Sequence, residues 1–561
     1  MSNLTKIALA AALALPAAAY GSAPVELTQK PVSSETHMDG LKLAKKAPSR
    51  TMAKAPEILD YIDETYLPEG KVTSLIQSGQ AYKLYWGDPT YVEYDGVATE
   101  IVDGDDGFVY LKNPFSHFTT DSYIQGKKEG NTYVFDLPRL VYPATSIIGG
   151  GTGDWYISLM QYDAEQKTYH PANFDAAAAA GLPQIDNKLV LTINADGSFS
   201  YKTDENYSVI YGMCGTAQDN WLGYAEINCT WTAFNDKVVT PPAGLQTEER
   251  IFSYILIDDF NDGADTGHYV NIGYDGDDVY IQGIFETLPT AWVKGHKEGS
   301  IISVPTGQYL GYYEYDHTHT YGTTVVYEKV DGQYKYEFTD NIEFTVDANG
   351  NLSAPGQGFL YTPGANPVNY YSALLDPRIK SVSAEMSNIP MAPTNVEYKL
   401  DGQYPTIEFT VSNKNVDGEI LNPDYLFYSV YVDGEQYAFK YDIYGSIDFI
   451  KRYIPFAYHD GKDFFSQADR RKVYFYFKDN ETFGVRLHYF DKDGVTLLGE
   501  SEITTIQAKP SAVEDVEAAK DIASVKYLDL AGCEVAEPVN GVFLKVVTYT
   551  DGSKETIKVM K

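Results

Sequence analysis

The sequence predicts an all-β, multidomain protein, and three observations predict it. Aromatic residues make up 14% of the 561 residues, with 48 tyrosines, and aromatic side chains favour the half-buried surfaces of β-sheets. Short stretches of alternating apolar and polar residues are separated by Asp-Gly and Asn-Gly turns, which are typical of antiparallel hairpins. The length also exceeds what one hydrophobic core fills, so we expect about three to five folded units.

Similar segments occur twice along the chain, in the same order. The matching pairs are 67–73 with 241–247, 105–130 with 277–299, and 193–200 with 346–353. The spacing between partners shrinks along the chain, as it does when two copies of one domain differ in loop length. We therefore expect two related β-sandwich-like repeats, copy one at 67–240 and copy two at 241–390.

The chain is strongly acidic. It has 43 Lys and Arg against 78 Asp and Glu, which gives a formal charge of −35. A field of this sign repels phosphate backbones, and the sequence has no basic patch with interleaved aromatic residues. We therefore expect no nucleic-acid partner, and solubility outside the cell is the simplest meaning of the acidity.

The N-terminus predicts export. Lys6 precedes an apolar stretch at 7–19 that ends in three alanines, which is the pattern of a signal peptide at 1–19. That stretch is too short to span a bilayer, and no later segment is long and apolar enough, so we expect no transmembrane segment. Residues 20–66 are rich in Pro, Ser, Lys and Ala and predict a flexible linker.

The chain has three cysteines, and two of them lie close together in a β region. In an oxidising periplasm such thiols pair, so Cys214 and Cys229 are predicted to form a disulfide. Their spacing permits this bond, but it does not determine where the two side chains point. The spacing of all three fits no zinc or haem motif.

Residues 391–509 resemble a fibronectin type III module. The resemblance rests on the opening Ala392-Pro393, on Asp-Gly turns, and on alternating strands such as the one with Ile407, Phe409 and Val411. It implies a small β-sandwich that acts as a spacer or a docking unit.

Residues 510–561 resemble the C-terminal sorting domain of type IX secretion cargo. The matching features are Tyr527, Asp529-Leu530, Gly532, Val535, Gly541 to Leu544, Asp551-Gly552 and Lys558-Val559. Cys533 stands where the family commonly has Arg. The resemblance implies recognition by the type IX machinery and delivery, through the periplasm, to the outer surface or the medium of a Gram-negative bacterium.

One acidic segment is a candidate cation site. Asp259, Asn261, Asp262 and Asp265 gather oxygen donors of the kind that calcium prefers. The segment does not fit an EF-hand loop, because Gly263 falls one position early and no Glu closes the loop. A solvated acidic turn explains the same residues without an ion, so calcium and a bare turn both remain open.

Catalytic motifs are missing from the sequence. It has no Gly-x-Ser-x-Gly, no His-Glu-x-x-His and no phosphate-binding glycine loop. The best candidate for an exposed aromatic contact is Trp155, which follows the glycine-rich segment 149–153 and could stack on a sugar ring.

These observations lead to one main hypothesis and two alternatives. We expect a secreted or cell-surface noncatalytic binding or adhesion protein, whose two related domains contact a glycan or another surface protein. A carbohydrate-active hydrolase with unidentified catalytic carboxylates is the first alternative, because glycosidases carry no short motif. A structural surface-layer component is the second.

Overall fold

The structure is a computed structural model. It describes residues 61–85, 88–118, 121–143, 154–217, 220–401, 404–445, 451–476, 482–508, 522–528, 534–535, 542–550, 552 and 554–560. The predicted signal peptide and nearly all of the predicted linker lie outside these residues. The chain divides into two compact units, Met1–Ser387 with Gly418–Asn422, and Asn388–Asp417 with Pro423–Lys561.

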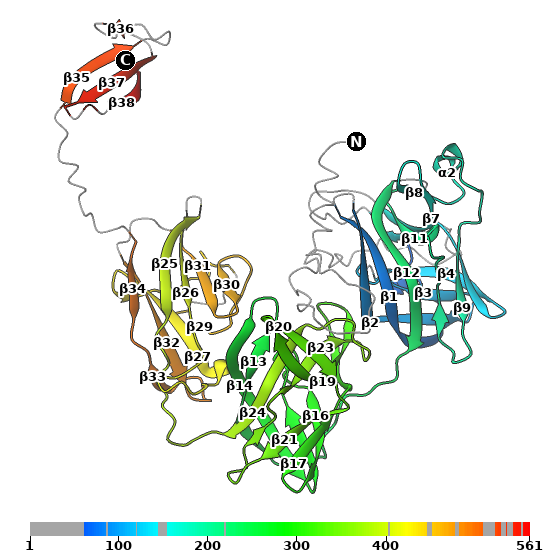
Figure 1. The fold of residues 1–561 in the computed structure, drawn as a ribbon, viewed down its shortest axis with the longest axis horizontal. Coiled ribbons are helices and arrows are strands. Elements are labelled where there is room, and N and C mark those ends of the chain that lie inside the picture. The colour runs from blue at the N-terminus through cyan, green and yellow to red at the C-terminus, as the bar shows by residue number, and fades with distance from the viewer. Residues whose placement is uncertain are drawn as a thin grey trace. The chain divides into compact units, whose positions relative to one another are not determined.

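The all-β, multidomain class is confirmed (Figure 1). Among the described residues, the helical elements are the short helix α2 (Asp175–Ala179) and the 3₁₀ turns η2 (Glu64–Tyr66) and η3 (Pro423–Tyr425). No helix in this described part has the length and apolarity needed to cross a membrane.

The first twelve strands form copy one. They are β1 (Gly70–Tyr85), β2 (Asp88–Gly104), β3 (Val109–Lys112), β4 (Tyr123–Glu129), β5 (Thr132–Asp136), β6 (Arg139–Tyr142), β7 (Trp155–Asp163), β8 (Thr168–Pro171), β9 (Lys188–Ile193), β10 (Phe199–Ser200), β11 (Val209–Cys214) and β12 (Trp221–Ala233). Eight of them pair antiparallel in a closed ring, in the order β1-β2-β3-β4-β5-β9-β10-β12 and back to β1. A side sheet leaves the ring at β12 and continues through β11 to β7, which also pairs with β6 and β8.

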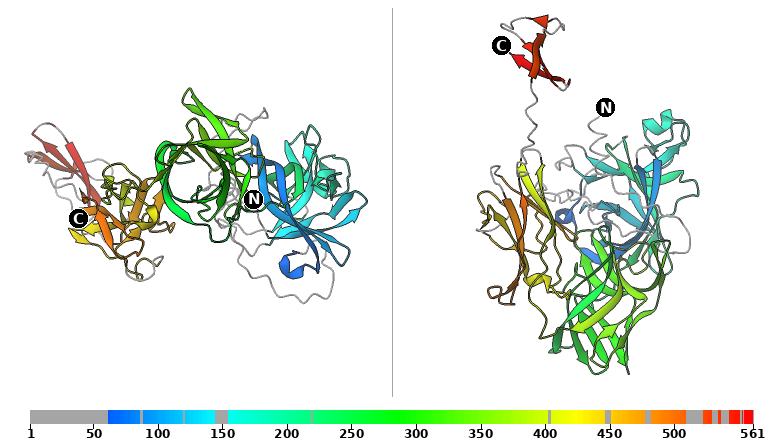
Figure 2. Two further views of the ribbon diagram at one scale, coloured as in Figure 1. Left: turned by 90° about the horizontal axis from the view of Figure 1, so that it is seen from below. Right: turned by 60° about the vertical axis from the view of Figure 1, so that its left-hand side comes forward.

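The next twelve strands form copy two. They are β13 (Thr247–Ile257), β14 (Asp262–Asp275), β15 (Asp278–Gln282), β16 (Trp292–Glu298), β17 (Ile301–Pro305), β18 (Gln308–Tyr313), β19 (Thr318–Val330), β20 (Gln333–Phe338), β21 (Asn341–Val346), β22 (Leu352–Ser353), β23 (Gln357–Pro363) and β24 (Ser372–Ser381). The ring β13-β14-β15-β16-β17-β21-β22-β24 closes in the same way, and the left view of Figure 2 shows these green strands around a common axis. Its side sheet runs from β24 through β23 to β19, which pairs with β18 and β20.

Strand for strand, the two copies pair identically, from β1 with β13 to β12 with β24. The sequence predicted a sandwich for each copy, whereas each sheet closes on itself. Alternating strands suit both arrangements, and the difference lies in the last strand, which returns to pair with the first. The predicted Asp-Gly turns form hairpins: Gly276 has φ +62° in the turn between β14 and β15, a conformation that favours glycine.

Apolar side chains fill both rings. In β9 of copy one, Leu189 and Leu191 are fully buried while Val190 between them is exposed, as the alternation of a strand requires. A second apolar cluster covers the outer face of each side sheet, around Met160 and Ile210 in copy one and around Val325 and Leu375 in copy two.

The second unit contains two further sheets in the region that resembles fibronectin type III. One pairs β25 (Thr394–Asp401), β26 (Tyr404–Thr410), β31 (Arg470–Tyr474) and β30 (Phe464–Gln467). The other joins β27 (Leu426–Val432), β28 (Glu435–Gln436), β29 (Ile454–Pro455), β32 (Thr482–Phe490), β33 (Leu497–Glu500) and β34 (Thr504–Gln507). Phe409 contacts Tyr428 across the two sheets, with ring centroids 5.3 Å apart, so the sheets pack face to face.

The C-terminal segment has a sheet of its own, in the order β36 (Glu534–Val535), β35 (Ile522–Leu528), β37 (Val542–Tyr549), β38 (Lys554–Met560). Tyr527 pairs with Val535, and the last hairpin turns at Gly552, which has φ +82°. The predicted features at 529–533, 541 and 551 lie outside the described residues.

Candidate ligand-binding face

The outer face of the copy-one side sheet carries a dense group of aromatic side chains. We call it the tyrosine face; its members are Tyr82, Tyr91, Tyr156, Tyr162, Tyr169, Tyr207 and Trp221. Alternation places them on one side: Tyr162 and Tyr169 lie directly opposite each other in β7 and β8, with ring centroids 5.1 Å apart. Tyr169 in turn contacts Tyr82 at 5.7 Å and Trp221 at 5.3 Å, so the rings form one continuous surface.

A glycine makes room for Trp221. A Cβ atom on Gly212 in β11 would lie 2.5 Å from Cζ3 of the indole, so the ring occupies the space that a side chain would take. Trp221 is half-buried there, and Tyr162 is 38% exposed, so solvent reaches the face.

The hydroxyl groups of the face converge. Tyr82, Tyr91, Tyr162, Tyr169 and Tyr207 are close enough to perturb one another electrostatically. The hydroxyl of Tyr169 donates to the carbonyl oxygen of Tyr207 at 3.0 Å. The other four make no hydrogen bond with any residue that the structure describes, so they are available to a ligand.

The hydroxyls of Tyr82, Tyr91 and Tyr169 remain protonated at neutral pH. Burial, followed by the neighbouring Tyr91, raises the pKa of Tyr82 to about 12, and burial also raises the pKa of Tyr91 and Tyr169. A neutral phenol both donates and accepts hydrogen bonds, and its ring offers an apolar surface. Together the groups present the chemistry that a sugar ring needs: stacking surfaces and uncharged hydrogen-bonding partners.

Trp155, the sequence-predicted contact, lies elsewhere. It begins β7, half-buried, and packs against the core inside copy one. Its ring stacks on Tyr142 at 4.8 Å and meets the edge of Phe118 at 5.6 Å. Two of its sides are therefore occupied by the protein, and its role in ligand binding stays a prediction.

The four predicted calcium ligands are not gathered around one point by the contacts of their loop. Asn261 donates both its backbone and side-chain N–H groups to Oδ1 of Asp258 at 2.8 Å, which forms a turn. Asp262 opens β14, and Asp265 pairs with Arg378 at 3.0 Å, while Asp259 lies exposed in the turn. No group of three or more His, Cys, Asp or Glu side chains among the described residues could hold a metal ion.

The predicted disulfide between Cys214 and Cys229 is wrong, because both cysteines are free thiols in the structure. Cys229 points into the ring, where its sulfur lies 3.3 Å from the hydroxyl of Tyr94. Cys214 belongs to the cluster on the outer face, with its sulfur 3.3 Å from that of Met160. The two thiols therefore lie on opposite faces of the sheet, where no S–S bond can join them. Cys533 lies outside the described residues.

A buried carboxylate occupies the inside of copy one. Glu226 is fully buried; its Oε1 accepts from the hydroxyls of Ser116 and Tyr224 at 2.7 Å and from the backbone N–H of Ser116 at 2.6 Å. Its Oε2 accepts from the hydroxyl of Tyr94 at 2.7 Å. Burial raises the pKa of Glu226, while these donors lower it. Both oxygens are engaged, so this carboxylate holds the loop after β3 inside the ring.

Lys83 shares that interior. It lies opposite Tyr224 in the β1–β12 pairing, and its side chain is buried beside Glu226. Burial lowers its pKa to about 8, and the charge of Glu226 opposes that change. The ammonium group thus faces away from the tyrosine face, on the opposite side of β1.

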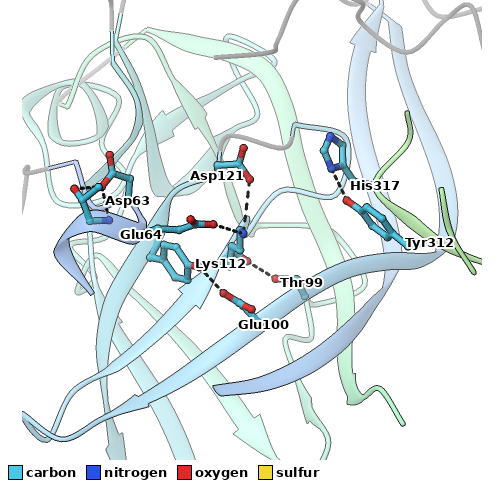
Figure 3. A network of polar contacts seen from close by, with 10 residues as sticks. Asp63, Glu64, Thr99, Glu100, Lys112, Asp121, Tyr312 and His317 are labelled. Atoms are coloured by element: carbon cyan, nitrogen blue, oxygen red, sulfur yellow. Dashed lines mark hydrogen bonds and ion pairs between the residues drawn. The ribbon is translucent and has the colours of Figure 1, made fainter. Parts of the chain in front are cut away.

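The two copies meet along a seam of polar contacts (Figure 3). Lys112 of copy one lies 3.5 Å from Glu64 and 3.7 Å from Asp121, and the Tyr312–His317 pair of copy two, joined at 2.7 Å, lies nearby. The backbone N–H of Ala98 donates to the carbonyl oxygen of His317 at 2.9 Å.

The seam also contains the motif His317-Thr318-His319. The pair does not form a two-ligand site, because His317 has φ +54° and precedes β19, and each imidazole bonds a different tyrosine. His319 stacks on Phe234 of copy one at 3.7 Å, and burial lowers its pKa to about 4. Both histidines therefore have packing roles.

Sequence reasoning missed the tyrosine face because its members come from β1, β2, β7, β8, β12 and the loop before β11. A local signal exists in β1, where Tyr82 and Leu84 lie two residues apart on one side of the strand; in β2, Tyr91 is followed two residues later by the acidic Glu93, so that strand gives no such signal. Nothing local links those strands to Trp221. No protein-family model matches the chain, and no curated protein matches it.

Proposed function

We propose that this chain is a noncatalytic extracellular binding protein and that its tyrosine face holds a glycan. The observation that carries the proposal is the set of four tyrosine hydroxyls without hydrogen bonds to the described residues, beside the half-buried indole of Trp221. Aromatic rings stack on the apolar faces of sugars, and phenol groups exchange hydrogen bonds with sugar hydroxyls.

Binding without turnover is supported by the state of Glu226, the fully buried acid of copy one. Hydrolysis of a glycoside needs a pair of carboxyl groups that reach the scissile bond from both sides. Both oxygens of Glu226 accept hydrogen bonds inside the ring. The tyrosine face itself is built from neutral groups, which bind a sugar but transfer no proton at neutral pH.

The ends of the chain support an extracellular location. Residues 1–19 have the pattern of a signal peptide, and 510–561 resemble a type IX sorting domain, which needs to fold as a separate recognisable unit. The sheet of β35 to β38, with no strand shared with the other sheets, agrees with that role. On this proposal the type IX machinery delivers the protein to the outer surface or the medium.

Co-sedimentation of the full chain with insoluble polysaccharides tests the function. We expect wild type to bind at least one polysaccharide and Trp221→Ala to lose about tenfold or more in affinity, as the loss of one buried aromatic contact implies. Tyr334→Ala on the side sheet of copy two is the matched control and should bind normally. Release of reducing sugar by the wild type, or equal binding by both variants, would contradict the proposal.

A further inference from the structure

We propose that the glycan held by the tyrosine face is uncharged, bearing neither carboxylate nor sulfate groups. This inference rests on the proposed function and names the substrate class of the same site.

The rim of the face is negative. Asp204 lies exposed in the loop before β11, and its charge reaches the hydroxyl of Tyr169. Its Oδ1 accepts from the backbone N–H groups of Asn206 and Ser208, both at 2.9 Å, and the Ser208 bond holds its pKa below the usual range. Asp204 is therefore ionised at neutral pH.

A second carboxylate stands at the start of β7. Oδ2 of Asp154 accepts a hydrogen bond from the hydroxyl of Tyr156 at 3.2 Å. Both rim charges have the sign of the whole chain, whose formal charge is −35. An anionic sugar meets repulsion at long range and again at the site.

In the part of the chain that the structure describes, no lysine or arginine stacks on the face. Lysine ammonium groups lie over the rings of Tyr123, Tyr133, Tyr274, Tyr280 and Tyr334, but among the described residues none lies over a ring of the tyrosine face. The nearby Lys83 points into the ring of copy one instead. An anionic sugar would therefore meet no cation stacked on these rings.

The groups that remain are suited to a neutral sugar. The hydroxyls of Tyr82, Tyr91, Tyr162 and Tyr207 donate and accept without charge. A cationic sugar is less suited, because Asp204 is held in its own turn and Asp154 is bonded to Tyr156. The face thus selects by uncharged hydrogen bonds and stacking.

The experiment compares each neutral oligosaccharide that binds the full chain with its carboxylated, its sulfated and its amino derivative, by calorimetry in 0.05 M and 0.5 M NaCl. At low salt we expect the anionic derivatives to bind at least about tenfold more weakly than the neutral parent. This difference in affinity should shrink at high salt, because salt screens the repulsion. The affinity of the neutral sugar should change by less than about twofold.

Two variants locate the effect. Asp204→Asn keeps the oxygen that caps the turn but removes the charge. At low salt it should therefore reduce the difference in affinity between the neutral sugar and its anionic derivatives. Asp196→Asn is the control, because Asp196 caps Ser198 in the same way between β9 and β10 and is likewise ionised.

Three outcomes would overturn the inference. An anionic derivative that binds as tightly as its neutral parent contradicts it, and so does an amino sugar whose binding is tightest and falls steeply with salt. Failure of every glycan to bind would reject the proposed function and this inference with it, whereas Trp221-dependent binding of an anionic derivative as tight as that of its neutral parent would reject the inference alone.

Discussion

Copy one and copy two share a ring and a side sheet but differ in what fills them. In copy one, Tyr211 of β11 pairs with Glu226 of β12, and in copy two Phe359 of β23 pairs with Leu374 of β24 at the corresponding place. A polar pair in one ring is thus replaced by an apolar pair in the other. The backbone tolerates both because each pair is internally consistent: the buried carboxylate has its donors, and the buried leucine needs none.

The outer faces differ in the same manner. Tyr162 opposes Tyr169 in copy one, and Tyr327 opposes Tyr336 in copy two. Gly212, which makes room for Trp221, is matched in copy two by Leu360, a fully buried member of the apolar cluster on that outer face.

Two hydroxyls on the face of copy two are engaged. Lys329 donates to the hydroxyl of Tyr334 at 3.2 Å, and the pKa of Tyr327 is raised by burial and by a hydrogen bond to Asp376. The two copies therefore share the same strand pairing, while tyrosine hydroxyls that are open to a ligand occur on the face of copy one.

The largest expected effect comes from putting the copy-two residue into the ring of copy one. Glu226→Leu removes the buried carboxylate that accepts from the hydroxyls of Tyr94, Tyr224 and Ser116, and we expect it to lower the free energy of unfolding by about 3–5 kcal/mol. Urea denaturation measures this. Glu226→Gln keeps one acceptor and should cost less; a loss below about 1 kcal/mol in Glu226→Leu would mean that the carboxylate is not the centre of the network.

Exchanging the glycine beneath Trp221 comes next. Gly212→Leu brings a side chain into the space of the indole, so we expect a loss of about 1–3 kcal/mol in stability and displacement of Trp221 from the face. Sugar binding should fall about tenfold with it. The reciprocal Leu360→Gly should destabilise copy two and create no new binding. Unchanged indole fluorescence and unchanged binding in Gly212→Leu would argue against this placement of Trp221.

A buried acid in the turn before β19 gives copy two a pH dependence. Burial raises the pKa of Asp316 to about 7, far above that of an unfolded Asp, so the native state binds the extra proton. Stability from this group is therefore present at low pH and is lost as the pH rises through 7. Between pH 7.5 and 6 the gain should be about 1 kcal/mol.

Thermal melts of wild type and Asp316→Asn across that range measure the difference. His319, whose pKa is lowered to about 4, works in the opposite direction but equally in both proteins. Parallel pH profiles of the two proteins would show that Asp316 does not titrate in this range.

The smallest effect concerns the cysteines. Because Cys214 and Cys229 lie on opposite faces of the sheet, air oxidation should leave both as thiols. Alkylation of the unfolded, unreduced chain followed by peptide mass analysis should find both modified. A peptide pair linked by Cys214–Cys229 would contradict the register of β11 and β12.

The sequence was informative where the relevant contacts are local. Asp-Gly turns and strand alternation depend on neighbours in the chain, so the all-β class was predicted correctly. Ring closure was not predictable, since it depends on β12 returning to β1. The disulfide prediction was wrong for a related reason. Successive side chains of a strand point to opposite faces, and Asn228, with φ +53°, interrupts that alternation just before Cys229, which places Cys229 on the face opposite to Cys214.

The candidate site shows the same limit. Trp155 drew attention because of its glycine-rich neighbours, whereas Trp221 gains its place from Gly212 on another strand. That relation exists only after the strands pair.

Oxidative footprinting of the full chain, with and without a bound oligosaccharide, tests the central claim most directly. Mass spectrometry reads the modification of each aromatic side chain, so both copies are compared in one molecule. The account predicts protection of Tyr91, Tyr162, Tyr207 and Trp221 and no change at Tyr327 and Tyr334. Protection at Tyr327 and Tyr334, or equal reactivity of Trp221 in the free and bound protein, would contradict it.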